Sequence, residues 1–245
     1  MVSDGSGPRV SVADAGDEAY WLAARLSVPV FVGADRVRSV QSVSALGCDA
    51  AVLDDGFSHR RLHRDLDILS VRPTDLCPSA AMFPAGSLRE PPTAAARAHL
   101  VTGFDTDFRQ NTAGVRRPDF TFAHEPLGLV DAGGRRSSLP PGPTDVYLVS
   151  GIADPVRFAH TARASGFRVV GEARFRDHHV FNVLEITKVF SEAAAKGAEM
   201  LLTTEKDLVR FPVHNGPLPL RALRIETRIV AGEARLLGRL LELFS

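Results

Sequence analysis

The stretch Val146–Val170, VYLVSGIADPVRFAHTARASGFRVV, contains a complete strand–helix–strand unit. The apolar run Val146–Val149 predicts a buried strand, and Asp154-Pro155 predicts the cap and first residue of a helix that ends at Gly166. Arg168–Val170 predicts the next strand. Two strands joined through a helix run parallel with a right-handed crossover. The stretch therefore predicts an α/β fold with a parallel sheet.

The same order continues toward the C-terminus. Asn182, with Glu185 three residues later, has the pattern of a capping box and predicts a helix that ends near Gly197. Glu199–Thr203 and Ala222–Ile225 are expected to be strands. Leucines four apart in Glu233–Phe244 predict a closing helix packed on the sheet rather than a membrane anchor.

The first half is less regular but shows the same two element types. Apolar runs and amphipathic stretches predict helices at Asp17–Leu26 and Asp35–Gly47 and strands at Val28–Gly33, Ala50–Leu53, Asp67–Val71 and His99–Gly103. Pro73–Arg97 reads as a loop with one short helix. Phe120, Phe122 and the run Leu127–Val130 predict a pair of strands, with a hairpin-like turn at Asp131-Ala-Gly-Gly. The Pro-rich segment Leu139–Thr144 predicts a linker, which divides the chain into domains 1–144 and 145–245.

Composition excludes several classes of protein. The chain has 245 residues with 29 basic and 29 acidic side chains, and this balance argues against a general nucleic-acid binder. Two cysteines do not make the disulfide framework of a small secreted protein. No apolar stretch is long enough to span a bilayer. The first 20 residues lack the apolar core of a signal peptide. We therefore expect a soluble, cytoplasmic protein. Only three of the basic residues are lysines, Lys188, Lys196 and Lys206.

The densest cluster of chemically useful side chains is Leu53–Asp67, LDDGFSHRRLHRDLD. If Ala50–Leu53 is a strand, Asp54 and Asp55 lie at the carboxyl edge of a parallel sheet, where ligands bind and where a Walker-B carboxylate reaches Mg²⁺. The alternative is a polar turn that caps a helix. The arginines and histidines that follow could hold phosphate groups, or could form a solvated face paired with Asp65 and Asp67, which we favour for this patch taken alone.

Other candidates are each open to two interpretations. Asp17 and Glu18 precede a helix, where carboxylates act as caps or as a general base. Arg89-Glu90 could clamp an anionic substrate or be solvated loop charges. In Asp177-His178-His179, one histidine oriented by a carboxylate could serve in acid–base chemistry, although such pairs are more often structural. Thr203–Asp207 is explained by helix capping alone.

Seven motifs occur in one order, and together they resemble the tetraacyldisaccharide 4′-kinases, the lipid A pathway kinases of Gram-negative bacteria. The motifs are GDE (16–18), VGADR (32–36), LDDGFSHRRLHRDLDI (53–68), PAGSLREP (84–91), SGIADPVRF (150–158), FRDHH (175–179) and TTEKD (203–207). The resemblance runs from Gly16 almost to the C-terminus.

This resemblance implies a P-loop NTPase fold, to which we add a second α/β domain. It implies that ATP and Mg²⁺ are used to phosphorylate the 4′-hydroxyl of tetraacyldisaccharide 1-phosphate at the cytoplasmic face of the inner membrane, with peripheral membrane contact. In it Asp17 is the base and His178 its orienting partner. The remaining roles fall on Asp54 and Asp55 near the metal, and on Glu18, Arg36, Arg89, Glu90 and, in support, His59 around substrate and phosphates.

The sequence departs from the family pattern chiefly at its N-terminal side, with smaller departures at Ala19 and Ser58. The family has a Walker A loop ending in Gly-Lys-Ser/Thr before its GDE motif, and here Gly5-Ser6-Gly7-Pro8 lacks both the lysine and the hydroxyl residue. We expect that the first strand, loop and helix of the family are absent, that a start codon assigned too far downstream explains this, and that the chain as given binds ATP poorly. The alternative is a catalytically inactive protein of the family that still binds the lipid disaccharide.

A third hypothesis takes Asp177-His178-His179 with Asp54-Asp55 as a metal-dependent phosphoesterase of the DHH type. That class uses further aspartate motifs, and no such set is found in the sequence. We therefore discount it.

Overall fold

The expected strand–helix order of the second half is present in the computed structural model, which describes residues 1–109, 116–212 and 216–245. The chain forms two compact units. The first unit contains residues 1–34 and 126–226, and the second contains residues 35–125 and 227–245. Each is described by itself below.

The first unit is built on a parallel sheet in the order β8-β7-β9-β10. The strands are β7 (Thr144–Ser150), β8 (Phe167–Arg174), β9 (Met200–Thr204) and β10 (Leu220–Ala231). The helices between them are α5 (Pro155–Ala164), α6 (Val183–Ala195) and α7 (Glu205–Leu208). Asp154 caps α5, and Asn182 and Glu185 form the capping box of α6, so both cap predictions are confirmed.

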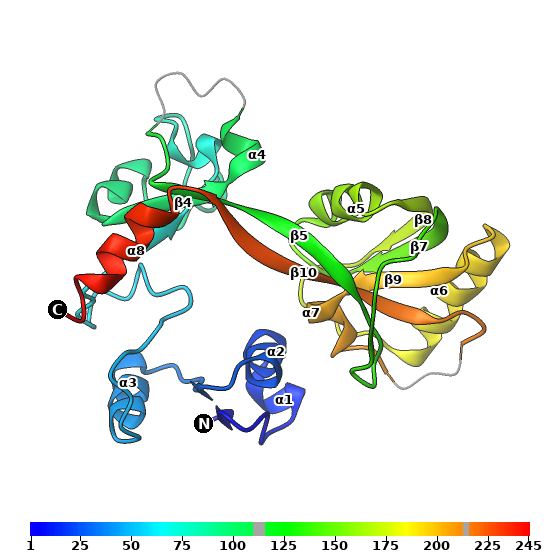
Figure 1. Cartoon of the computed structure of the whole chain (residues 1–245), viewed down its shortest axis with the longest axis horizontal. Helices are drawn as coiled ribbons and strands as arrows, with labels where there is room; N and C mark the ends of the chain where they lie inside the picture. Colours follow the sequence, from blue (N-terminus) through cyan, green and yellow to red (C-terminus); the bar gives the residue numbers. More distant parts are fainter. Residues whose placement is uncertain (110–115, 213–215) are drawn as a thin grey trace. The chain divides into compact units, whose positions relative to one another are not determined.

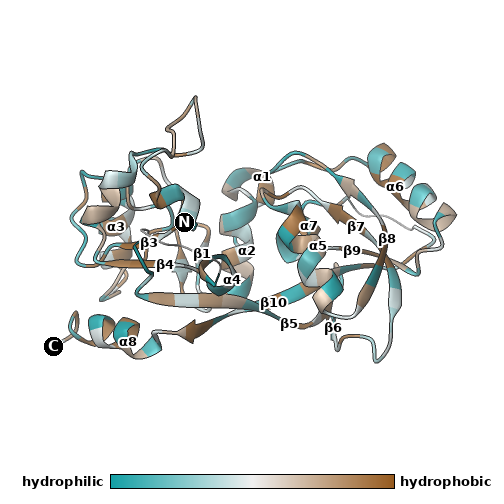
Figure 2. Ribbon diagram, turned by 90° about the horizontal axis from the view of Figure 1, so that it is seen from above, coloured by the Kyte–Doolittle hydropathy of each residue, from teal (hydrophilic) through white to brown (hydrophobic). Residues whose placement is uncertain are grey.

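Alternating side chains of β7 fill two cores, one on each face of the sheet. Val146 and Leu148 pack with Phe158 of α5, whereas Tyr147 and Val149 pack with residues of α6. The two helices accordingly lie on opposite faces (Figure 1). The buried strands β7 and β9 are largely hydrophobic along their length (Figure 2), as expected of a sheet covered on both sides.

The N-terminal part of the first unit is small. It contains β1 (Ser3–Asp4), α1 (Val12–Ala15), α2 (Asp17–Arg25) and β2 (Pro29–Val30). Val2, Ala15 and Ala23 form its core. The expected strand Val28–Gly33 is reduced to two residues that pair antiparallel with β1, and Val28 and Val32 are exposed. The partner strand β1 has only two residues, which limits the length of the ladder.

The second unit contains a smaller parallel set of strands, β3 (Ile68–Ser70), β4 (Leu100–Phe104) and the start of β5 (Phe120–Val130). Around them lie α3 (Arg36–Ser44), the 3₁₀ helices η1 (Pro73–Leu76) and η2 (Pro92–Arg97), α4 (Asp105–Phe108) and α8 (Glu233–Leu241). Asp35 caps α3 as predicted. Leu236 and Leu240 of the predicted closing helix α8 are half-buried, and Arg235 pairs with Asp119 at 2.7 Å.

Two expectations for the first half differ from the structure. Ala50–Leu53 is not a strand, and Val52 is fully exposed, because within the described residues no strand lies beside it to complete a ladder. Phe120–Val130 is one continuous strand rather than two. The expected hairpin turn does follow it, and β5 pairs across the turn with β6 (Arg136–Ser137).

The compact units divide the chain differently from the predicted boundary after Thr144. Both β5 and β10 contribute residues to each unit, so each unit draws on both halves of the sequence. Thr144 itself begins β7, inside the first unit.

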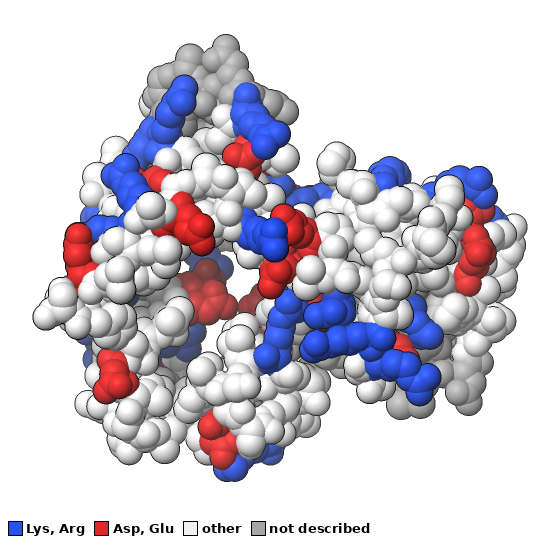
Figure 3. Space-filling view, viewed as in Figure 1, with Lys and Arg blue, Asp and Glu red and all other residues white. Residues whose placement is uncertain are grey.

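The surface carries both signs of charge, as the equal numbers of acidic and basic residues require, and Figure 3 shows both signs across the face in view. In the part of the chain that the structure describes, no helix is long and apolar enough to cross a membrane.

We expect Leu202→Ala to lower the free energy of unfolding by about 2–5 kcal/mol, because Leu202 is fully buried between β7 and β10 and its removal leaves a cavity. Urea unfolding followed by circular dichroism measures this change. Leu184→Ala is the matched control, since Leu184 is 83% exposed. Equal effects of the two substitutions would contradict the assigned core.

Candidate functional site

In the first unit, Asp17 and His178 form a hydrogen-bonded pair. The Nδ1 atom of His178 lies 3.0 Å from Oδ1 and 3.1 Å from Oδ2 of Asp17. Gly16 precedes Asp17 with a φ of +80°, a conformation that glycine adopts without strain, so the carboxylate stands in the first turn of α2. The Asp17 side chain is 11% exposed and that of His178 is 51% exposed. A shielded carboxylate therefore touches an imidazole that is open to solvent.

His178 is held in an unusual backbone conformation. Its φ of +60° lies in the left-handed region, which residues other than glycine rarely occupy. The backbone N–H donates to the carbonyl of Gly151 at 3.1 Å and to the carboxylate of Asp177 at 3.0 Å. These bonds fix the turn that directs the imidazole toward Asp17, and strain of this kind persists where the surroundings impose it.

The charges around Asp17 favour its ionised form. Partial burial tends to raise the pKa of Asp17, but the hydrogen bond from His178 and the positive charges of Arg210 and Lys206 outweigh burial and hold the pKa below the ordinary aspartate value. Glu18, the next residue, accepts a hydrogen bond from Lys206 Nζ at 2.8 Å. Asp17 in this pair is therefore an ionised carboxylate.

In the second unit, Asp54 and Asp55 lie on an exposed turn rather than at the end of a strand. Arg89 Nη1 donates to Asp55 Oδ2 at 3.0 Å. His59 is exposed, and its backbone N–H closes the turn onto Gly56. Arg36 is the first residue of α3 and is half-buried. The structure thus brings Asp55 and Arg89 together.

Glu90 is the centre of an ion-pair cluster. Its carboxylate accepts hydrogen bonds from Ser58 Oγ at 2.9 Å, Arg60 Nη2 at 2.9 Å and Arg97 Nη2 at 2.8 Å. Burial opposes ionisation, but these three donors outweigh it and lower the pKa of Glu90 to about 2. Glu90 is therefore ionised at every pH near neutrality, and it ties the turn after Asp55 to the loop that follows Arg89.

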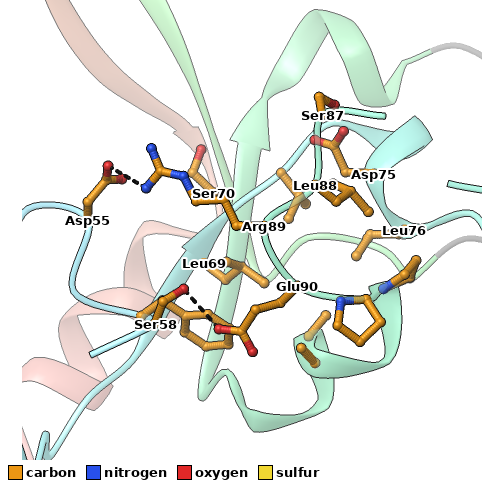
Figure 4. Close-up of a pocket in the computed structure, with 16 residues that line it drawn as sticks. Asp55, Ser58, Leu69, Ser70, Asp75, Leu76, Ser87, Leu88, Arg89 and Glu90 are labelled. Carbon is orange, nitrogen blue, oxygen red and sulfur yellow. Dashed lines mark hydrogen bonds and ion pairs between the residues drawn. The ribbon is translucent and has the colours of Figure 1, made fainter. Parts of the chain in front are cut away.

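A cavity of about 260 Å³ lies beside this cluster in the second unit. Figure 4 shows Glu90 with Ser58 on one side and Arg89 with Asp55 on the other, with Leu69 and Leu88 among the apolar lining. The cavity thus combines an apolar wall with a guanidinium and carboxylates, a composition that suits an amphipathic ligand with an anionic group.

The described residues contain no group of three or more His, Cys, Asp or Glu arranged to hold a metal ion. The donor chemistry at Asp54 and Asp55 nonetheless fits Mg²⁺, which takes carboxylate oxygens from one or two residues and completes its shell with water and phosphate. These two residues are the ones that would hold it.

Three residues in or next to the surroundings of Asp17 were not predicted as site residues. Lys206 and Asp207 lie in the motif TTEKD, where Thr204 does cap α7 as expected by accepting from the Asp207 N–H at 3.0 Å. Asp207 also pairs with Arg210, which no motif indicated. In the basic patch, Arg64 pairs with Asp67 at 2.6 Å, but the two side chains are only 15% and 13% exposed, so this pair is not part of a solvated face. Arg60 binds Glu90.

The fold and these clusters define an α/β protein with a parallel sheet of the P-loop NTPase type. The comparison with known families makes this specific. The chain belongs to the family described as tetraacyldisaccharide-1-P 4′-kinase, which it matches over residues 1–245.

Individual relatives agree with this assignment. The chain is 36% identical over 249 residues to the tetraacyldisaccharide 4′-kinase of Anaeromyxobacter dehalogenans strain 2CP-C, covering 95% of this chain and 66% of that protein. It is 31% identical over 251 residues to the protein of that name from Syntrophus aciditrophicus, covering 94% of this chain and 67% of that protein. The chain thus spans about two thirds of the length of these curated relatives.

A solved structure shows the same fold. The crystal structure of LpxK from Aquifex aeolicus in complex with ATP has a TM-score of 0.75 and is 27% identical, and the match covers all of this chain and 74% of that one.

We expect Glu90→Gln to lower the free energy of unfolding by about 1–3 kcal/mol at neutral pH, because a neutral amide accepts less well from two guanidinium groups. The folded pKa of about 2 lies below the ordinary value of 4.5, so this stabilisation is complete above about pH 4.5 and is lost as the pH falls through 2. Urea unfolding of wild type and variant between pH 2 and 7 measures the difference.

The matched control for this prediction is Glu125→Gln. Glu125 pairs with Arg228 at 3.1 Å in the same unit, but both side chains are largely exposed. Such pairs contribute about 0–1 kcal/mol. If the difference in the free energy of unfolding between wild type and Glu90→Gln does not become smaller toward pH 2, the ion-pair cluster assigned to Glu90 is contradicted.

Proposed function

We propose that this protein catalyses the ATP-dependent phosphorylation of the 4′-hydroxyl of tetraacyldisaccharide 1-phosphate, a step in lipid A synthesis. The observation that carries the proposal is the Asp17–His178 pair, which joins two motifs separated by 161 positions, at the residues that the family resemblance marks as base and orienting partner. The family assignment over the whole chain supports it.

Asp17 accepts the proton of the attacking hydroxyl. Its lowered pKa keeps the carboxylate ionised before the reaction, and His178 fixes its orientation through the 3.0 Å contact. Because phosphoryl transfer requires positioning and charge neutralisation more than covalent chemistry, an oriented base is the main demand on the acceptor side.

The remaining roles concern the phosphates and the sugar. Mg²⁺, held through Asp54 and Asp55, would supply charge neutralisation to the phosphates of ATP. Arg36 and Arg89 bind phosphate oxygens, for which the guanidinium fork is suited. Glu90 positions the loop that carries Arg89, Glu18 lies beside the base, and His59 has a supporting role.

The acylated substrate requires contact with a lipid surface. We propose that the protein acts on the cytoplasmic side of the inner membrane and meets it peripherally. The ATP complex of the related Aquifex aeolicus protein supports the choice of nucleotide.

One sequence observation favours a second candidate, a catalytically inactive protein that binds the lipid disaccharide. None of the three lysines in the 245 residues lies in a Gly-Lys-Ser/Thr loop. A kinase assay with radiolabelled ATP and tetraacyldisaccharide 1-phosphate separates the two, using the 245 residues alone and preceded by their upstream in-frame sequence. We expect turnover only for the longer chain; disaccharide binding without turnover in both would favour the inactive protein.

In the active chain we expect Asp17→Asn to lower kcat by about 10²–10⁴-fold, because the amide cannot accept the hydroxyl proton. The KM for ATP stays near the wild-type value. Asp14→Asn is the control, since Asp14 lies three residues earlier and its exposed carboxylate accepts a hydrogen bond from the Ser11 hydroxyl. Retention of wild-type kcat by Asp17→Asn would remove Asp17 from the proposed role.

A further inference from the structure

Arg210 is a buried arginine of the first unit that none of the roles above uses. Its side chain is 4% exposed, and its guanidinium forms an ion pair with Asp207, whose side chain is fully buried. Nη2 also donates to the carbonyl of Gly151 at 2.9 Å. The Nε atom lies 3.5 Å from Oδ2 of Asp17.

This arrangement leaves part of the guanidinium without a full set of hydrogen bonds. Within the described ranges, Nε and Nη1 of Arg210 are buried side-chain nitrogens that have no hydrogen-bond partner. Burying a charged group with unmade hydrogen bonds destabilises a fold, and an apolar residue of similar volume would avoid that cost. Stability alone therefore does not account for an arginine here.

The contacts of Arg210 reach both members of the Asp17–His178 pair. The Gly151 carbonyl that accepts from Arg210 also accepts from the backbone N–H of His178 at 3.1 Å. The Gly151 N–H donates to Asp207 at 3.1 Å, so the segment is held from both sides. The Nη2 atom of the guanidinium thus supports the turn of His178 through Gly151, while Nε points to the carboxylate of Asp17.

There is little space in which this segment could move. A Cβ atom at Gly151 would lie 3.1 Å from the carbonyl oxygen of Arg176 and 3.3 Å from Cβ of His179. The ring of Phe181 also lies near the guanidinium, at 5.9 Å from its centroid to Cζ of Arg210. Because the packing around Gly151 is close, the position of the Arg210 guanidinium constrains the position of the His178 backbone, which is bonded to the same carbonyl.

We propose that Arg210, anchored by Asp207, is a positioning residue that sets the placement of both the Asp17 carboxylate and the His178 turn. The proposal rests on the proposed function, because it assigns a task to Arg210 only if Asp17 is the base. Arg210 acts through these two residues and need not touch the substrate.

The charge of Arg210 gives the proposal a measurable consequence. The charged groups in contact with Asp17 are His178 from the turn after β8 and Arg210 from the segment after β9, and Lys206 is near enough for its charge to act on Asp17. Three carboxylates pair in turn with these groups: Asp177 with His178 and Lys206, Glu18 with Lys206, and Asp207 with Arg210. Arg210 is one of the positive charges that lower the pKa of Asp17. Its neutralisation therefore raises that pKa, and the acid limb of a rate profile that depends on ionised Asp17 moves to higher pH.

The first experiment measures Asp17 directly, without turnover. The side-chain carboxyl carbons of aspartate are labelled with ¹³C in the 245-residue chain, the Asp17 signal is assigned with Asp17→Asn, and its pKa is determined in wild type and Arg210→Gln. We expect an upward shift of about one unit, as loss of a nearby opposite charge produces. A folded Arg210→Gln with an unchanged Asp17 pKa would overturn the proposal.

Arg25→Gln is the matched control. Arg25 is an arginine of α2 that binds Glu205 at 2.7 Å and the carbonyl of Ile225 at 3.1 Å in the same unit, away from Asp17. We expect it to leave the Asp17 pKa unchanged. An equal shift in Arg25→Gln would show a general loosening of the unit and would also overturn the proposal.

A second variant, Arg210→Lys, keeps the charge and removes the fork. In the chain that turns over we expect kcat to fall about tenfold with little change in either KM, because one ammonium group cannot hold Gly151, Asp207 and Asp17 together. If Arg210→Gln does not fold, Arg210→Lys tests the positioning role instead. A kcat of Arg210→Lys equal to that of wild type would refute that role. Absence of turnover in the longer wild-type chain would refute the proposed function alone, and the carboxyl titration of the 245-residue chain would still test the placement of Asp17.

Discussion

The parallel pairing of β7 with β8 on one side and β9 on the other is the constraint on which the first unit depends. Because the three strands run in one direction, their carboxyl ends meet at one edge of the sheet. Gly151 follows β7, His178 follows β8, and the segment from Glu205 to Arg210 follows β9. The hydrogen bonds of Gly151 with Asp207, Arg210 and His178 are therefore consequences of strand direction. They join residues far apart in sequence at this edge.

The second unit holds its candidate residues by a different means. Asp54, Asp55 and Glu90 belong to turns and loops, and ion pairs take the place of a strand ladder. Glu90 accepts from three side chains contributed by two segments, so one carboxylate orders both the turn near Ser58 and the loop near Arg97. Hydrogen bonds of this charge-assisted kind are the strong ones, and they fix the loop that carries Arg89 without regular secondary structure.

Local signals in the sequence were sufficient where each element satisfies its own requirements. The capping box at Asn182, the Asp154-Pro155 cap and the apolar run of β7 were all predicted, because caps and buried strands depend on neighbouring residues. The strand predicted at Ala50–Leu53 was wrong, because an apolar run becomes a strand only beside another strand, and that condition is not local. The Asp17–His178 pairing was anticipated only through family resemblance. Arg210 gave no signal at all, because its importance comes from burial, which no spacing reveals.

Asp17 and Asp207 lie close to the same arginine, but the pKa values of their carboxylates are shifted in opposite directions. Both face Arg210, yet burial raises the pKa of Asp207 against the pull of its hydrogen bonds, whereas the charges and the His178 contact lower the pKa of Asp17. The difference follows from exposure, since the Asp207 side chain is fully buried and that of Asp17 retains 11%. A fully buried carboxylate cannot exchange protons with a substrate, but it can hold a guanidinium in place. The arrangement therefore separates the carboxylate that anchors Arg210 from the carboxylate that we propose as the base, with the arginine between them.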